Sequence, residues 1–117
     1  MRRVAIVPRT DLETKRVILH DTGRSGTFLY LCRSIEDTGG YADEWYESAA
    51  HATAACSDRF GIQEEMWNDV PDPEPGCQHD WIAPVRVRGR VEGKPQWGEF
   101  ERREGDRWVP FDKGLAR

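Results

Sequence analysis

The chain has 117 residues, of which 32% are charged and 38% hydrophobic, and its formal net charge is −4. This negative charge argues against overall attraction to nucleic acid or to an anionic membrane. No apolar run approaches the roughly 20 residues that are needed to cross a bilayer, so no membrane association is expected.

The N-terminal apolar stretch, Val4 to Val7, is too short to be the core of a signal peptide. The chain has three cysteines, and an odd number favours reduced thiols over a disulfide framework. We therefore expect a cytoplasmic protein without a cofactor. Cys32 and Cys56 are expected to be buried, whereas Cys77, in a proline-rich segment, is expected to react fastest with thiol reagents.

The first third of the chain predicts three strands. Val4 to Val7 is a short apolar run that ends at Pro8, which indicates an edge strand because proline cannot donate to a ladder. Arg16 to His20 and Thr27 to Cys32 are apolar and β-branched or aromatic. The turn formers of Asp21 to Gly26 lie between them, so the pair is predicted to be a hairpin.

A helix is predicted next. Glu44 to Glu47 fits either a fourth strand or the start of a helix, and Ser48 is a good N-cap for the helical spacing from Ala49 to Phe60. Gly61 follows as a C-terminal stop. One face of this helix carries small and apolar residues, namely Ala49, Ala52, Thr53, Cys56 and Phe60. A face this rich in alanine predicts close packing on a sheet.

The last part of the chain predicts a loop and three strands. Gln63 to His79 contains several prolines and is predicted to be a loop. The strands are predicted at Trp81–Arg90, Trp97–Arg103 and Arg107–Phe111, with a tight turn at Glu104–Asp106.

Strands on both sides of one helix predict an α+β fold, with an antiparallel sheet of five to six strands and one main helix packed on one face. We expect residues 1–111 to form a single domain. Residues 112–117 are expected to form a frayed C-terminal tail.

The segment from His20 to Phe28 resembles known catalytic motifs in part. Its Gly-Arg-Ser-Gly-Thr-Phe run resembles the back half of the phosphate-binding loop of cysteine-dependent tyrosine phosphatases, but Asp21 stands where that loop has its nucleophilic cysteine. Asp21-Thr22-Gly23 also resembles the catalytic triplet of aspartic proteases, without the apolar residues that precede it there. Ser25 lies in a Gly-Arg-Ser-Gly run, which is one residue short of the Gly-x-Ser-x-Gly motif of a nucleophile elbow. That elbow needs a strand that runs into a helix. A hairpin turn is the preferred interpretation.

The segment from Trp45 to Ile62 resembles a unit of small uncharacterised bacterial proteins, and this resemblance implies no activity. The best metal candidates are Cys77, His79 and Asp80, where Cys and His two apart could ligate one zinc ion. No further ligands recur at zinc-finger spacing, so no metal site is predicted. The alternative is a polar loop with local hydrogen bonds.

Arg86, Arg88 and Arg90 are predicted to lie on one face of their strand, with Trp81 and Trp97 beside them. Arginine with aromatic residues on a sheet can bind single-stranded nucleic acid. The acidic residues nearby favour ion pairs across the hairpin instead, with Glu99 or Glu101 as the partner.

Five Trp are more than one small core easily encloses, so some are expected to be exposed at an interface. We therefore expect a non-catalytic protein-interaction or self-associating module. Its partner is expected to be a second copy, in a homodimer, or an unknown protein. The expected interaction residues are Trp81, Trp97, Trp108, Arg86 and Arg88. One alternative is a small hydrolase-like enzyme with a cleft around His20, Asp21, Arg24 and Asp80. The other is nucleic-acid binding through Arg86, Arg88 and Arg90.

Overall fold

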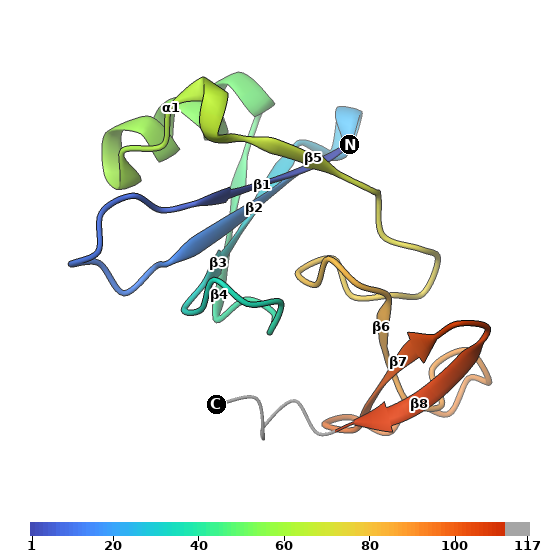
Figure 1. Cartoon of the computed structure of the whole chain (residues 1–117). Helices are drawn as coiled ribbons and strands as arrows, with labels where there is room; N and C mark the ends of the chain where they lie inside the picture. The colour runs from blue at the N-terminus through green and yellow to red at the C-terminus, as the bar shows by residue number, and fades with distance from the viewer. Residues whose placement is uncertain (112–117) are drawn as a thin grey trace. The chain divides into compact units, whose positions relative to one another are not determined.

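The computed structural model describes residues 1–111, which form two compact units, one from Met1 to Asp72 and one that begins at Pro73. Figure 1 shows the elements of both units. The single domain expected over residues 1–111 stays a prediction, and the tail expected at 112–117 lies outside the described residues. Within the part of the chain described here, no helix combines the length and the apolar character that crossing a bilayer requires.

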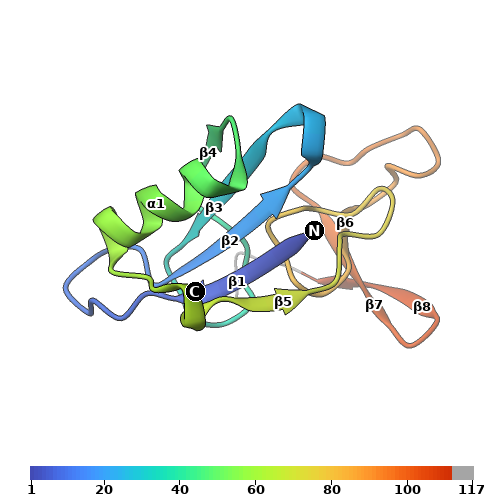
Figure 2. The same ribbon diagram turned by 90° about the horizontal axis from the view of Figure 1, so that it is seen from above.

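The first unit contains a five-stranded antiparallel sheet, here called sheet A, whose strand order is β4-β3-β2-β1-β5. Its strands are β1 (Arg2–Ile6), β2 (Arg16–Asp21), β3 (Thr27–Cys32), β4 (Ala42–Tyr46) and β5 (Asn68–Val70). The single α-helix among the described residues is α1 (Ala49–Phe60), and it covers one face of this sheet (Figure 2). The predicted α+β fold, with one helix on an antiparallel sheet, is therefore confirmed.

Local signals set the ends of α1 where the sequence predicts them. The Ser48 hydroxyl accepts a hydrogen bond from the backbone N–H of His51 at 3.1 Å, which satisfies one of the unpaired donors of the first turn. Gly61 ends the helix in the left-handed conformation, with φ at 72°, which glycine adopts without steric cost. The segment Glu44 to Glu47, which fits strand or helix by sequence, contains the end of strand β4.

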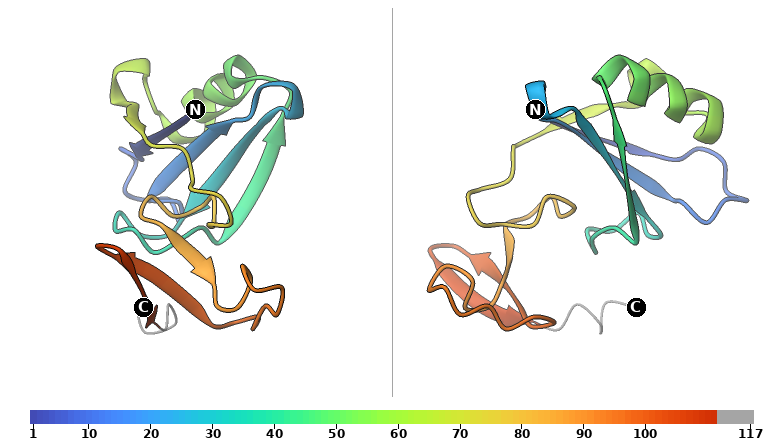
Figure 3. Two further views of the ribbon diagram at one scale, coloured as in Figure 1. Left: turned by 90° about the vertical axis from the view of Figure 1, so that its right-hand side faces the viewer. Right: turned by 180° about the vertical axis from the view of Figure 1, so that it is seen from behind.

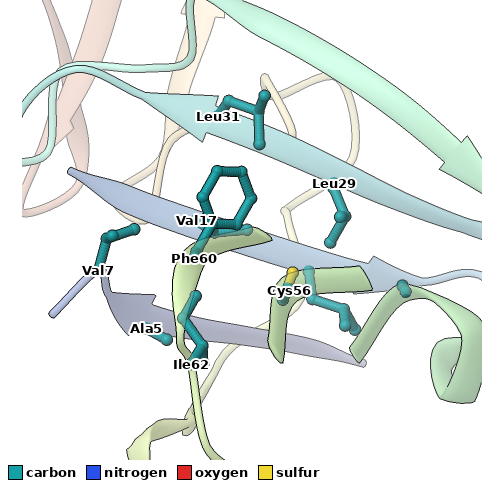
Figure 4. Packing of buried hydrophobic residues seen from close by; sticks show 10 residues of the cluster. Ala5, Val7, Val17, Leu29, Leu31, Cys56, Phe60 and Ile62 are labelled. Atoms are coloured by element: carbon teal, nitrogen blue, oxygen red, sulfur yellow. The ribbon is translucent and has the colours of Figure 1, made fainter. Parts of the chain in front are cut away.

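The core of the first unit lies between α1 and one face of sheet A (Figure 4). Alternation along the strands turns every second side chain of β1, β2 and β3 toward the helix. The helix contributes Ala52 and Cys56, which are fully buried, and Phe60 at its last turn. The buried members of this core are Ala5, Val7, Val17, Leu19, Leu29, Leu31, Ala52, Cys56, Phe60 and Ile62.

Two details of the first unit correct the sequence-based expectations. Strand β1 is not at an edge, because β5 pairs with its other side, and Pro8 lies beyond the ladder and removes no hydrogen bond from it. The segment Gln63 to His79 is not entirely loop, since it contains the 3-10 turn η2 (Glu64–Met66) and β5. Strand β5 has only three residues, two of them polar, so it has no alternating pattern from which a strand could be predicted.

The second unit contains a three-stranded antiparallel sheet, here called sheet B, in the order β6-β7-β8 (Figure 3). Its strands are β6 (Val85–Val87), β7 (Phe100–Glu104) and β8 (Arg107–Phe111). Three C-terminal strands are confirmed, but the first is shorter than predicted. The chain turns after Val87, where Gly89 has a φ of +78° and no side chain could fit against the carbonyl of Lys94.

We predict that Ala52→Leu destabilises the first unit by about 1–3 kcal/mol, because the added methylenes must overpack a helix face with no free space. A urea melt measures the loss. Ala54→Leu is the matched control, since Ala54 is exposed on the same helix. Equal stability of the two variants would contradict the tight packing of this face.

Candidate interaction surfaces

The segment with partial resemblance to catalytic motifs is a hairpin turn between β2 and β3. Asp21 accepts a hydrogen bond from the backbone N–H of Gly23 at 2.9 Å, and the Thr22 hydroxyl donates to the carbonyl of Gly26 at 2.6 Å. A single 3-10 turn, η1 (Gly23–Ser25), lies between them. The segment therefore runs from strand to strand, as predicted, and does not have the strand-to-helix geometry of a nucleophile elbow.

The residues of the hydrolase-like alternative do not converge within the first unit. Leu19 packs toward α1, so alternation along β2 turns His20 to the opposite face of the sheet and Asp21 back to the helix side. Arg24 is exposed in η1. Asp80 belongs to the second unit and is half-buried. The geometry of the first unit thus assigns Asp21 a turn-forming role.

The turn also supports an aromatic side chain of the neighbouring strand. The indole N–H of Trp45, on β4, donates to the carbonyl of Ser25 at 2.8 Å. A methyl group added to Gly26 would lie 2.3 Å from the same indole nitrogen, so the ring rests directly on the glycine. Trp45 nevertheless remains 54% exposed. The result is a fixed, solvent-facing aromatic ring, which sequence analysis did not single out.

An ion pair joins β4 to α1. Arg59, in the last turn of the helix, donates to both carboxylate oxygens of Glu44, at 2.5 and 3.0 Å, and to the hydroxyl of Tyr46 at 3.2 Å. The hydrogen bond from Arg59 holds the pKa of Glu44 below its ordinary value, and the same bond raises the pKa of Arg59. Burial raises the pKa of Tyr46, and the neighbouring Glu44 raises it further. This cluster pairs its charges with each other and has a structural role.

All three cysteines are thiols, and all three are buried. Burial raises the pKa of the Cys56 thiol to about 12, which keeps it protonated and unreactive at neutral pH. The predicted burial of Cys32 and Cys56 is thus confirmed. Cys77 is also buried, with 4% of its surface exposed despite the prolines around it, and its faster reaction with thiol reagents stays a prediction.

Sheet B pairs its arginines with acidic and aromatic neighbours. Arg86 donates to a carboxylate oxygen of Glu101 at 2.6 Å, and its guanidinium lies 3.9 Å from the centroid of the Trp108 ring. The predicted ion pair across the strands is confirmed for Arg86. Arg88 is exposed just beyond β6, and Arg90 lies in the following turn, so the three arginines do not continue one strand.

The remaining predicted interaction residues differ in exposure. Trp81 is buried, with an exposed fraction of 5%, and packs edge-on against Phe111 at a centroid distance of 5.6 Å. Trp108 is half-buried beneath Arg86. Trp97 is 75% exposed. The interaction role of this set stays a prediction, and its solvent-facing aromatic member is Trp97.

The second unit has two depressions, and the chain neighbours of Trp97, Gly98 and Gln96, each line one of them. One has a volume of about 430 Å³, and it is lined by Arg88, Gly98, Glu99, Phe100, Pro110 and Phe111. The other has a volume of about 330 Å³, and it is lined by Arg86, Arg88, Gly89, Glu92, Lys94, Gln96 and Glu101. The first is lined by two phenylalanines and a proline, with one cation and one anion, whereas the second is lined by charged residues, one glutamine and one glycine. The first is therefore the better receptor for an aromatic side chain.

The three residues that could ligate a metal by sequence differ in exposure. Cys77 is buried, Asp80 is half-buried and His79 is exposed. Within residues 1–111, no group of three or more His, Cys, Asp or Glu side chains is close enough to hold a metal ion. Cys77 also donates its backbone N–H to Glu74, as part of a local turn.

No protein-family model matches the chain, and no curated protein or solved structure is significantly similar to it.

We predict that the Arg59–Glu44 pair makes stability depend on pH. Because the pKa of Glu44 is lowered in the folded protein, its pairing stabilises the fold above its ordinary pKa of about 4.3, and this stabilisation is lost as the pH falls through the lowered value. Wild type should exceed Glu44→Gln in free energy of unfolding at pH 7, and the difference should shrink below about pH 4. Urea melts at several pH values measure it, with Glu65→Gln at an exposed site as the control. A constant difference from pH 7 to pH 3 would contradict the pairing.

We predict that Gly26→Ala displaces the Trp45 ring. The new methyl group overlaps the indole, and the φ of +88° is one that alanine avoids. Gly23→Ala is the matched control, because Gly23 also has a positive φ, of +72°, but has nothing within 4 Å of the added atom. This variant should therefore lose only about 1–2 kcal/mol of stability through backbone strain. The Trp45 indole N–H resonance should shift in Gly26→Ala and stay in place in Gly23→Ala. An unchanged resonance in both variants would show that the ring does not rest on Gly26.

Proposed function

We propose that this chain is a non-catalytic protein-binding module that associates with itself as a homodimer through the second unit. The observation that carries the proposal is Trp97, whose side chain is 75% exposed and whose chain neighbour Gly98 lines a depression together with Phe100, Pro110 and Phe111. An exposed tryptophan is costly to leave in water, and tryptophan is enriched among interface hot spots.

Two-fold symmetry suits this arrangement. In a two-fold dimer the same patch of each copy faces the other, so Trp97 of one copy can enter the depression of the other, and the reverse contact forms at once. The rim of the depression carries Arg88 and Glu99, which are of opposite sign and can pair across the symmetry axis. Residues 73–111 contain seven Lys or Arg and seven Asp or Glu, so two copies of this surface do not repel each other.

Two further observations favour protein binding over hydrolase-like catalysis and over nucleic-acid binding. His20 and Asp21 point to opposite faces of sheet A, which leaves no converging catalytic pair in the first unit. Arg86 is engaged by Glu101 and Trp108, which leaves it poorly placed to contact phosphates. Three cysteines in the thiol form support a reducing compartment, and we propose the cytoplasm.

We predict a dimer at micromolar concentration that Trp97→Ala weakens about thirtyfold or more, which is the effect of losing a hot spot worth about 2 kcal/mol. Sedimentation velocity over a dilution series measures the dissociation constant. Trp97→Ala should fold normally, because its side chain makes few contacts in the monomer.

The matched control is Trp45→Ala, which removes an exposed tryptophan from the first unit and should leave the dimer intact. A mass that stays monomeric at every concentration would refute self-association. A dimer that Trp97→Ala does not weaken would refute the surface.

A further inference from the structure

The strand β4 forms an edge of sheet A. In the described part of the chain it pairs with β3 and with no other strand, and it is the outermost ribbon of its sheet in Figure 3. Three of its five residues, Ala42, Asp43 and Trp45, are exposed, and the strand has no proline or bulge to block pairing. Its outer backbone groups can therefore accept an additional strand.

This edge presents Trp45 in a fixed position. The hydrogen bond to the Ser25 carbonyl and the contact with Gly26 hold the ring, and Phe28 lies opposite it across the ladder. Little side-chain entropy is therefore lost when another molecule covers the ring. Carboxylates alone could serve to protect an edge from aggregation, but protection does not need an exposed, immobilised tryptophan.

The charge of the edge is negative. Asp43 lies on the same face of β4 as Trp45, and Glu47 follows the strand. Among residues 1–111, neither carboxylate forms an ion pair, whereas Glu44 is neutralised by Arg59. The whole first unit contains eight Lys or Arg against thirteen Asp or Glu. A cation can stack on the exposed ring of Trp45 while it pairs with a neighbouring carboxylate.

A second copy of the chain does not fit this edge. Antiparallel pairing of two β4 strands about Trp45 places Asp43 opposite Glu47, and pairing about Glu44 brings the unneutralised Asp43 and Glu47 of both copies to one interface. Like charges directly opposite each other destabilise a strand pair. The edge is thus matched to a partner that differs from this chain in charge.

We propose that β4 is a docking edge for an extended, arginine-rich segment of another protein, which adds a strand to sheet A. The backbone of the segment pairs with the outer edge of β4. Arginines at alternate positions contact Trp45, Asp43 and Glu47, because alternate side chains of a strand share a face. This surface lies in the first unit and is independent of the self-association surface around Trp97.

The test is binding of a fluorescein-labelled peptide of four Arg-Val repeats to the full-length protein, measured by anisotropy. Wild type should bind the peptide, and an otherwise equal peptide of Glu-Val repeats should not bind. Trp45→Ala and the double variant Asp43→Lys/Glu47→Lys should each weaken binding about tenfold or more. Glu64→Lys/Glu65→Lys reverses the same number of exposed charges on η2 and should bind as wild type does.

Three further outcomes decide the mode and the occupant. An Arg-Val peptide N-methylated at alternate residues keeps its charge but loses backbone donors, so it should bind about tenfold more weakly if a strand is added. Equal binding of the methylated peptide, or loss of binding in the η2 variant, would reduce the interaction to charge and overturn the proposal. Dissociation of the homodimer by Asp43→Lys/Glu47→Lys would identify a second copy as the occupant and would also overturn it. Trp97→Ala should leave peptide binding unchanged. A negative result for self-association and a negative result for peptide binding at β4 can therefore be told apart.

Discussion

The first unit depends on how closely α1 can approach sheet A. Ala52 and Cys56 face the sheet with no exposed surface, and side chains this small let the helix lie against the central strands. That contact buries the apolar face of β2 and β3 and provides most of the driving force for folding of a unit this small. It also brings the last turn of the helix to β4, where Arg59 can reach Glu44. The edge strand is therefore held in place by a helix packed on the face of the sheet.

A small residue also allows close packing in the hairpin turn between β2 and β3. Glycine at position 26 adopts a backbone conformation closed to other residues and leaves room for the Trp45 ring. A segment that resembles catalytic loops by sequence is thus explained as a turn that supports an aromatic side chain on the next strand. The two exposed tryptophans, Trp45 and Trp97, lie on separate units, which gives the chain two distinct surfaces on which binding energy can concentrate.

Much of the fold could be predicted from local sequence because local interactions determine it. The bounds of α1 follow from the Ser48 cap and from Gly61, and β8 follows from the tight turn before it. The pairing of β5 with β1 could not be predicted, since three residues carry no periodicity and the contact joins segments more than 60 residues apart. The burial of Trp81 and the exposure of Trp45 were equally inaccessible, because tertiary packing and not residue type decides which aromatic side chain is enclosed.

The proposed self-association depends on Trp97, the exposed tryptophan of the second unit. The most direct measurement is a set of two-dimensional ¹H–¹⁵N spectra of the full chain over a hundredfold dilution, with the Trp97 indole N–H assigned from a Trp97→Phe variant. The account predicts that the Trp97 indole resonance moves with concentration, while those of Trp45 and Trp67 in the first unit do not. A Trp97 resonance that stays fixed, while sedimentation shows the mass changing over the same range, would contradict it.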